Sequence, residues 1–120
     1  MIEFNNNIPV YLQILIYLKE KIIKKELKEG DKMPSVRELA RDLKVNPNTV
    51  QRAYKDLETE KIIITKRGMG SYVTDDISQI EKMRENIAKE IINEFSLRMK
   101  NMGYSKKEML GIIDSFVEGD

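Results

Sequence analysis

The chain has 120 residues and a formal net charge of +1, with 41% hydrophobic and 34% charged residues and neither cysteine nor histidine. This composition is typical of a helix-rich globular protein without a membrane span, and it excludes disulfides, common zinc sites and histidine-based nucleophiles. We therefore expect neither metal nor cofactor, and the absence of a secretory pattern at the N-terminus favours a cytoplasmic protein without a membrane partner.

The first helix is predicted from Val10 to about Glu26. Pro9 suits the start of a helix, where a missing N–H costs nothing, and the polar residues 1 to 8 before it form a short arm. Apolar side chains then recur at helical spacing and form one buried stripe, which consists of Tyr11, Ile14, Leu15, Leu18, Ile22 and Ile23. We expect this helix to support the fold, with Tyr11 in the core.

The second helix is predicted to start at Ser35. Ser35 and Glu38 form a capping box, in which the serine hydroxyl accepts from the third amide and the glutamate reaches back. Its inner face consists of Val36, Leu39, Ala40 and Leu43, whereas Arg37 and Arg41 lie four residues apart on the outer face. Just before this helix, Lys32-Met33 is a candidate for a very short strand.

The third helix follows a turn formed by residues 44 to 46, in which Val45 is an apolar plug. Asn46 caps the helix and Pro47 takes its first position. The inward residues are Val50, Ala53, Tyr54 and Leu57, and the exposed ones are Asn48, Thr49, Gln51 and Arg52. A capped, polar helix start suits a phosphate, and Asn and Gln form bidentate bonds to adenine in the major groove.

Residues 62 to 65 and 71 to 74 predict a β-hairpin around a glycine-containing turn. Its basic, small-residue tip lets the backbone approach a duplex while Arg67 reaches into a groove. The fold class is therefore mainly α with a small β-hairpin, a winged helix-turn-helix over residues 8 to 76. The predicted DNA contacts are Ser35, Arg37, Arg41, Asn46, Asn48, Thr49, Gln51, Arg52, Lys66, Arg67 and Gly68.

The C-terminal region, residues 77 to 120, predicts two further helices. The first is long and amphipathic, from Ile77 to Met102, and Gly103 ends it; a second capping box at Ser105 starts a short apolar helix. Two helices cannot bury so much apolar surface alone, so we predict that they pair with a second copy of the chain. The predicted dimerisation residues are Ile80, Met83, Ile87, Ile91, Phe95, Met99, Leu110, Ile113 and Phe116.

The charges are unevenly distributed along the chain. Residues 32 to 55 hold six basic side chains against two acidic ones, and residues 61 to 74 hold three basic side chains and no acid. From Asp76 onward there are nine acids against seven bases. This pattern fits a nucleic-acid-binding module joined to an interaction module, although an ordinary solvated surface also produces such runs.

Four segments together resemble one family of bacterial regulators. Residues 9 to 14, 30 to 40, 45 to 50 and 67 to 73 match the GntR family in order and spacing, and the two-helix C-terminal region resembles its YtrA-type subgroup. Members of that subgroup lack a large effector domain and often lie beside transporter genes. The resemblance implies operator binding as a two-fold dimer, with contacts from Arg37, Asn48, Thr49, Gln51, Arg67 and Gly68. Lys61 departs from the family, which usually has glycine there.

Other functions are less compatible with these residues. The carboxylates Glu81, Glu85 and Glu94 lie at helical surface spacing with no phosphate loop nearby, which disfavours an enzyme. A winged helix used for protein contacts usually loses the polar, basic face that this chain keeps. A small-molecule effector between the two C-terminal helices stays open. We expect a repressor on double-stranded, near-palindromic operator DNA, with half-sites one helical turn or a multiple apart.

Overall fold

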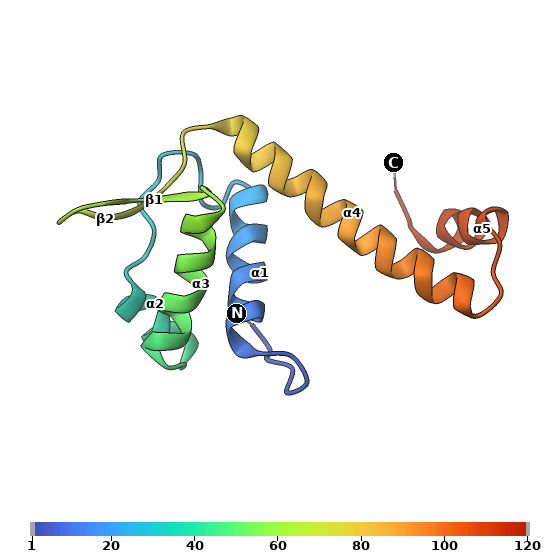
Figure 1. The fold of residues 1–120 in the computed structure, drawn as a ribbon, viewed down its shortest axis with the longest axis horizontal. Helices are drawn as coiled ribbons and strands as arrows, with labels where there is room; N and C mark the ends of the chain where they lie inside the picture. The colour runs from blue at the N-terminus through green and yellow to red at the C-terminus, as the bar shows by residue number, and fades with distance from the viewer. Residues whose placement is uncertain (1, 120) are drawn as a thin grey trace. The chain divides into compact units, whose positions relative to one another are not determined.

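The computed structural model describes residues 2 to 119, which form five helices and one antiparallel hairpin (Figure 1). The elements are α1 (Val10–Ile23), α2 (Val36–Leu43), α3 (Pro47–Thr59), β1 (Ile63–Lys66), β2 (Gly70–Val73), α4 (Ile77–Asn101) and α5 (Lys106–Phe116). The predicted fold class, mainly helical with a small hairpin, is confirmed. The chain divides into two compact units on either side of the Lys82–Met83 bond, within α4. We call the described residues up to Lys82 the head and those from Met83 the tail.

The core of the head is built around α3, which packs against α1 and α2 and contacts β1. The side chains at the predicted inward positions of α2 and α3 are buried, apart from Val36, which is half-buried. The largest fully enclosed side chains of the head are Ile14, Leu18, Ile22, Val50, Leu57, Ile62, Ile63 and Val73. Burial of each such aliphatic side chain stabilises the fold by about 1.5–3 kcal/mol, so these residues contribute much of the energy that holds α1, α2 and α3 together.

Lysines end all three helices of the helix-turn-helix head. Lys25, Lys44 and Lys61 have φ values of +64°, +58° and +62°, in the left-handed region that glycine usually occupies. After each lysine, the next N–H reaches back five residues to a helix carbonyl, as from Ile62 to Leu57 at 2.9 Å. This is the Schellman arrangement, which satisfies carbonyls at a helix C-terminus.

Two sequence expectations are affected by these lysines. The helix predicted to run to about Glu26 ends at Ile23, because Lys25 turns the backbone and the Glu26 N–H bonds to Lys21 at 2.9 Å. Lys61, at a position where the family usually has glycine, takes a left-handed conformation that glycine adopts without strain.

The hairpin pairs Ile63 with Val73 and Lys66 with Gly70. Both strands lie one residue away from the predicted segments: β1 begins at Ile63, because the Ile62 N–H is used to end α3, and β2 begins at Gly70. The predicted strand at Lys32-Met33 is a single bridge from Lys32 to Tyr72, supported by the Met33 N–H bond to Ser71 at 2.8 Å. The segment before α2 is thereby attached to the wing.

The predicted starts of both C-terminal helices are confirmed, and α4 ends at Asn101, one residue before the predicted end. The carboxylate of Asp76 accepts from the Ser78 N–H at 3.0 Å at the start of α4. Gly103, with φ of +90°, follows α4, and a capping box at Ser105 starts α5. No helix in residues 2 to 119 has the length and apolarity needed to cross a membrane.

Candidate nucleic-acid interface

Side-chain caps fix the first turns of both helices of the helix-turn-helix. The Ser35 hydroxyl accepts from the Glu38 N–H at 3.1 Å, and the Glu38 carboxylate accepts from the Ser35 N–H at 3.2 Å. These interactions with the side chain and backbone of Ser35 hold the pKa of Glu38 below its ordinary value. The Asn46 side chain accepts from the Asn48 N–H at 2.8 Å. Ser35 and Asn46, both predicted to touch DNA, therefore act within the chain as helix caps.

Tyr54 joins α3 to the segment that starts α2. Its hydroxyl donates to the Pro34 carbonyl at 2.5 Å, directly before the Ser35 cap. Its side chain is buried, as predicted, and burial, together with the charge of Glu38, raises the pKa of the phenol. The hydroxyl thus stays protonated as a donor and holds the first turn of α2, which carries Arg37, in a set position relative to α3.

The exposed side of α3 carries one polar and basic stripe. Each member lies three or four residues from two others, which places them on one face, and all four are exposed: Asn48, Gln51, Arg52 and Lys55. Thr49 is half-buried at the flank of this stripe. Lys55 was missing from the predicted contacts, although its spacing of four residues from Gln51 was a sufficient signal. We call the four exposed residues, without Thr49, the α3 stripe.

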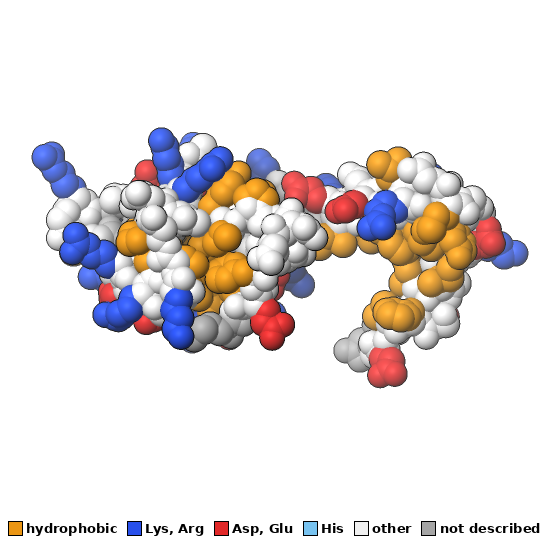
Figure 2. All heavy atoms as spheres, turned by 90° about the horizontal axis from the view of Figure 1, so that it is seen from below, with side chains coloured by type: hydrophobic (Ala, Val, Ile, Leu, Met, Phe, Trp, Pro, Cys, Tyr) orange, Lys and Arg blue, Asp and Glu red, His pale blue; other side chains and the backbone are white. Residues whose placement is uncertain are grey.

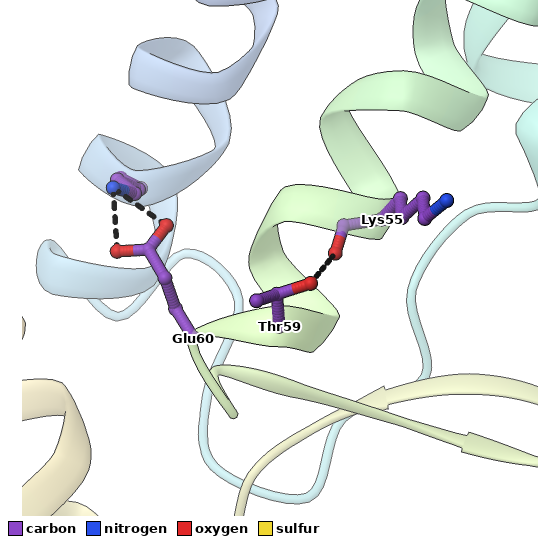
Figure 3. Close-up of polar contacts among 4 residues, drawn as sticks. Lys55, Thr59 and Glu60 are labelled. Atoms are coloured by element: carbon purple, nitrogen blue, oxygen red, sulfur yellow. Dashed lines mark hydrogen bonds and ion pairs between the residues drawn. The ribbon is translucent and has the colours of Figure 1, made fainter.

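The acidic residue that directly follows α3 is paired with a lysine of α1. Glu60 is bound by Lys19 of α1, with 3.0 Å between Nζ and a carboxylate oxygen. The Thr59 hydroxyl donates to the Lys55 carbonyl at 2.9 Å. Figure 3 shows the Glu60 carboxylate turned toward α1 and the Lys55 ammonium pointing away from it. Lys19, and not Lys55, therefore pairs with this carboxylate.

The two arginines on the outer face of α2 differ in availability. Both are exposed. Within residues 2 to 119, the Arg37 side chain has no hydrogen-bond or ion-pair partner, whereas Nε of Arg41 lies 3.6 Å from the Asp42 carboxylate. Such an exposed pair contributes little to stability, but it competes with any other anion for Arg41. Arg37 is the more available of the two.

Arg52 lies on the ring of Tyr11, with its guanidinium carbon 3.6 Å from the ring centroid. The expectation that Tyr11 is a core residue is wrong: its side chain is half-buried, and its ring is a platform for a residue of the α3 stripe. Tyr54, for which the same expectation was made, is in the core.

The wing tip carries Lys66, Arg67 and Gly68, all exposed. The Lys66 ammonium lies 4.4 Å from the centroid of the Tyr72 ring. Gly68 has φ of +77°, and an added Cβ would meet no atom within 4 Å, so its backbone conformation rather than lack of space requires glycine. Figure 2 shows Lys and Arg side chains projecting around the head on the face that it draws.

The predicted dimerisation residues fall into two groups. Ile80 and Met83 are already buried within a single chain. Ile87, Phe95, Met99 and Ile113 are half-buried, and Ile91, Leu110 and Phe116 are exposed by 62%, 56% and 83%. Other exposed apolar side chains of the tail are Ile92, Leu97, Met102, Ile112 and Val117. Figure 2 shows hydrophobic side chains gathered over the tail, so its unburied apolar surface is larger than predicted.

A hollow of about 350 Å³ lies on the tail and is lined by Ile91, Glu94, Phe95, Arg98, Met99 and Met102. All six belong to α4 or to the turn directly after it. The hollow is therefore a feature of one helix face and not a pocket between α4 and α5. Among the described residues, no group of three or more Asp, Glu, His or Cys side chains is arranged to hold a metal ion.

A capped helix-turn-helix with an exposed basic stripe, followed by a basic wing, defines a DNA-binding protein of the winged helix-turn-helix class. Residues 10–73 match the sequence profile described as bacterial regulatory proteins, gntR family. The chain belongs to the GntR family of helix-turn-helix transcription regulators.

Individual relatives agree with this membership. The chain is 39% identical over 117 residues to the uncharacterized HTH-type transcriptional regulator YhcF of Bacillus subtilis, covering 98% of this chain and 97% of YhcF. It is 49% identical over 75 residues to the HTH-type transcriptional repressor YtrA of the same organism, covering 62% of this chain and 58% of YtrA. A solved GntR family transcriptional regulator from Listeria monocytogenes superposes with a TM-score of 0.90 at 41% identity, over 96% of this chain and all of that one. All three are named as transcriptional regulators or repressors.

Proposed function

We propose that this protein is a YtrA-type transcriptional repressor that binds a near-palindromic operator as a homodimer. The observation that carries the proposal is the combination of two surfaces on one chain. The head has the α3 stripe, Arg37 and the wing tip as basic or polar groups with few partners of their own, and the tail has apolar side chains left exposed. The first surface fits a duplex and the second fits another copy of the chain.

On the operator, the α3 stripe lies in the major groove. Asn48 and Gln51 have the side-chain amides that read adenine, and Arg37 has a free guanidinium for a guanine edge or a phosphate. At the wing, Arg67 extends from a tip held by the Met69 N–H bond to Lys66 at 2.8 Å, and it contacts the neighbouring minor groove or backbone. The caps at Ser35 and Asn46 fix the first turns of α2 and α3. The N-termini of these two helices carry N–H groups that favour phosphates.

The dimer forms through the tail. Seven of the nine predicted dimerisation residues have an exposed or half-buried apolar side chain, and Phe116 has the largest exposed fraction, 83%. In water, so much apolar surface on two helices favours association with an identical surface. A two-fold dimer presents two heads to two half-sites, which is why the operator should be near-palindromic.

Repression rests on the likeness to YtrA, which is named a repressor and shares 49% identity over a 75-residue region. A dimer bound across a promoter excludes other proteins from that DNA. Its target is bacterial chromosomal DNA, so its place of action is the cytoplasm, and a transporter operon is the first candidate because of the subgroup's usual gene neighbours.

A footprint on the DNA upstream of the protein's own gene tests this function. The expected result is one protected site with two-fold symmetry, whose half-sites are centred about 10–10.5 base pairs, or a multiple, apart. The comparison is with random duplex at the same moderate salt, because phosphate contacts alone bind any sequence. Equal affinity for both kinds of DNA would show that the protein is not a sequence-specific regulator.

A further inference from the structure

The contact between Arg52 and Tyr11 is the closest of three contacts between a cation and an aromatic ring in the described residues. The guanidinium carbon is 3.6 Å from the ring centroid, against 4.4 Å for Lys66 over Tyr72 and 5.1 Å for Lys21 over Tyr17. At this separation the planar guanidinium lies against the ring face. Stacking uses the face of the guanidinium and leaves its N–H groups, which lie at the edges, free to donate.

Arg52 has a particular place on the α3 stripe. Asn48 and Lys55 lie along the middle of the exposed side of α3. Gln51 lies on the flank nearer α2, the side on which Tyr54 bonds to Pro34. Arg52 lies on the other flank, toward α1. On a recognition helix that lies in the groove, a long cationic side chain on the flank is within reach of the phosphates that border the groove. The position of Arg52 therefore suits a phosphate and not a base.

The platform under Arg52 is itself held in place. Tyr11 lies in the first turn of α1, where Pro9 provides no side-chain cap. Instead, the Gln13 side-chain amide donates to the carbonyls of Asn5 and Ile8, both at 2.8 Å, and its oxygen accepts from the Asn5 N–H at 2.8 Å. This clasp fastens the N-terminal arm to α1 and fixes the turn that carries the ring.

We propose that Tyr11 is a positioning residue for DNA binding: its ring holds the Arg52 guanidinium in the orientation that donates to a phosphate of the operator backbone. This inference rests on the function proposed above and deepens it. An arginine side chain that moves freely in solvent loses conformational entropy when it binds a phosphate, whereas a stacked arginine side chain has already lost most of that entropy. The competing explanation is that the stacked pair only packs α1 against α3.

The two explanations are separated by a double-mutant cycle with Tyr11→Leu, Arg52→Ala and the double variant. Binding is measured by fluorescence anisotropy on a labelled random-sequence duplex and on the footprinted fragment, across a series of salt concentrations starting at about 50 mM. Tyr17→Leu is the matched control, because it removes another tyrosine with a lysine over its ring from the same helix. Circular dichroism at each condition identifies the temperatures at which every variant is folded.

Arg52→Ala should weaken binding to both duplexes by the same factor and lower the salt slope by about one. Tyr11→Leu should weaken binding about two- to fivefold with the salt slope unchanged, because the charge remains while its orientation is lost. In the Arg52→Ala background the same change should have no further effect on binding. Tyr11→Phe, which keeps the ring, should recover most of the loss, and Tyr17→Leu should bind like the wild type.

The proposal is overturned if Arg52→Ala leaves the affinity and salt slope unchanged, and this result does not depend on how well a Tyr11 variant folds. It is also overturned if folded Tyr11→Leu binds as the wild type does. The same holds if Tyr11→Leu lowers the affinity as much in the Arg52→Ala background as in the wild type. Failure of the proposed function is a different result, in which the wild type itself shows no preference for the footprinted fragment over random duplex.

Discussion

Replacing Lys61 by glycine should stabilise the protein. Lys61 has φ of +62°, and for an L-residue the left-handed conformation costs about 1–2 kcal/mol. Glycine avoids this cost but loses about 0.5–1 kcal/mol through the greater freedom of the unfolded chain. The net increase in the free energy of unfolding is therefore about 0.5–1 kcal/mol. Because the Ile62 N–H bond to Leu57 is a backbone interaction, the substitution leaves the helix end intact.

Thermal unfolding at one fixed protein concentration measures this effect, since the proposed dimer would make the midpoint depend on concentration. For a chain of this length the midpoint should rise by about 2–4 °C. Lys61→Ala is the matched control, because alanine removes the same charge and keeps the left-handed cost. If alanine stabilised the protein as much as glycine does, the charge and not the backbone would be responsible. A lower midpoint for Lys61→Gly would refute the reasoning.

Three further variants test other parts of the structure. Tyr54→Phe removes the hydrogen bond to the Pro34 carbonyl and should lower the free energy of unfolding by about 1 kcal/mol in urea; an unchanged midpoint would mean that this bond contributes nothing. Ile91→Asp places a charge on an exposed apolar position of the tail and should give a monomer by light scattering, whereas Asn93→Asp, on the opposite side of α4, should leave the dimer intact. Glu38→Gln should make the free energy of unfolding fall less steeply as the pH is lowered. Folding lowers the pKa of Glu38, so its contribution to stability is present above the ordinary carboxyl pKa and is lost as the pH falls through the pKa of the folded protein. Urea midpoints between about pH 6 and pH 3 measure that slope, and an equal slope in both proteins would contradict it.

The parts of the fold that sequence predicts well are those specified by neighbouring residues. Ser35 with Glu38, and Ser105 with its partner three residues on, form capping boxes whose members are close in the chain, so α2 and α5 begin where expected. Gly103 ends α4 for an equally local reason. By contrast, Lys25 ends α1 without the glycine that normally marks such an end, and nothing in its side chain predicts a positive φ.

The parts of the site that sequence reasoning missed depend on packing between distant segments. Tyr11 and Arg52 are 41 residues apart, and only the packing of α1 on α3 brings the ring under the guanidinium. Likewise, helical spacing places Ile80 on an apolar stripe but does not distinguish burial within one chain from burial between two. Lys55 is different, because its spacing from Gln51 was visible in the sequence and only required the stripe to be extended by one turn.

The central claim is that two copies of one head, joined through the tail, read one operator. The most direct test compares binding to the whole footprinted site with binding to an isolated half-site, at one salt concentration, for the wild type and for Ile91→Asp. If the heads are joined, the wild type should prefer the whole site by about 10²-fold or more, and the variant should bind both duplexes with similar, weak affinity. Wild-type protein that bound a half-site as tightly as the whole site would contradict the account.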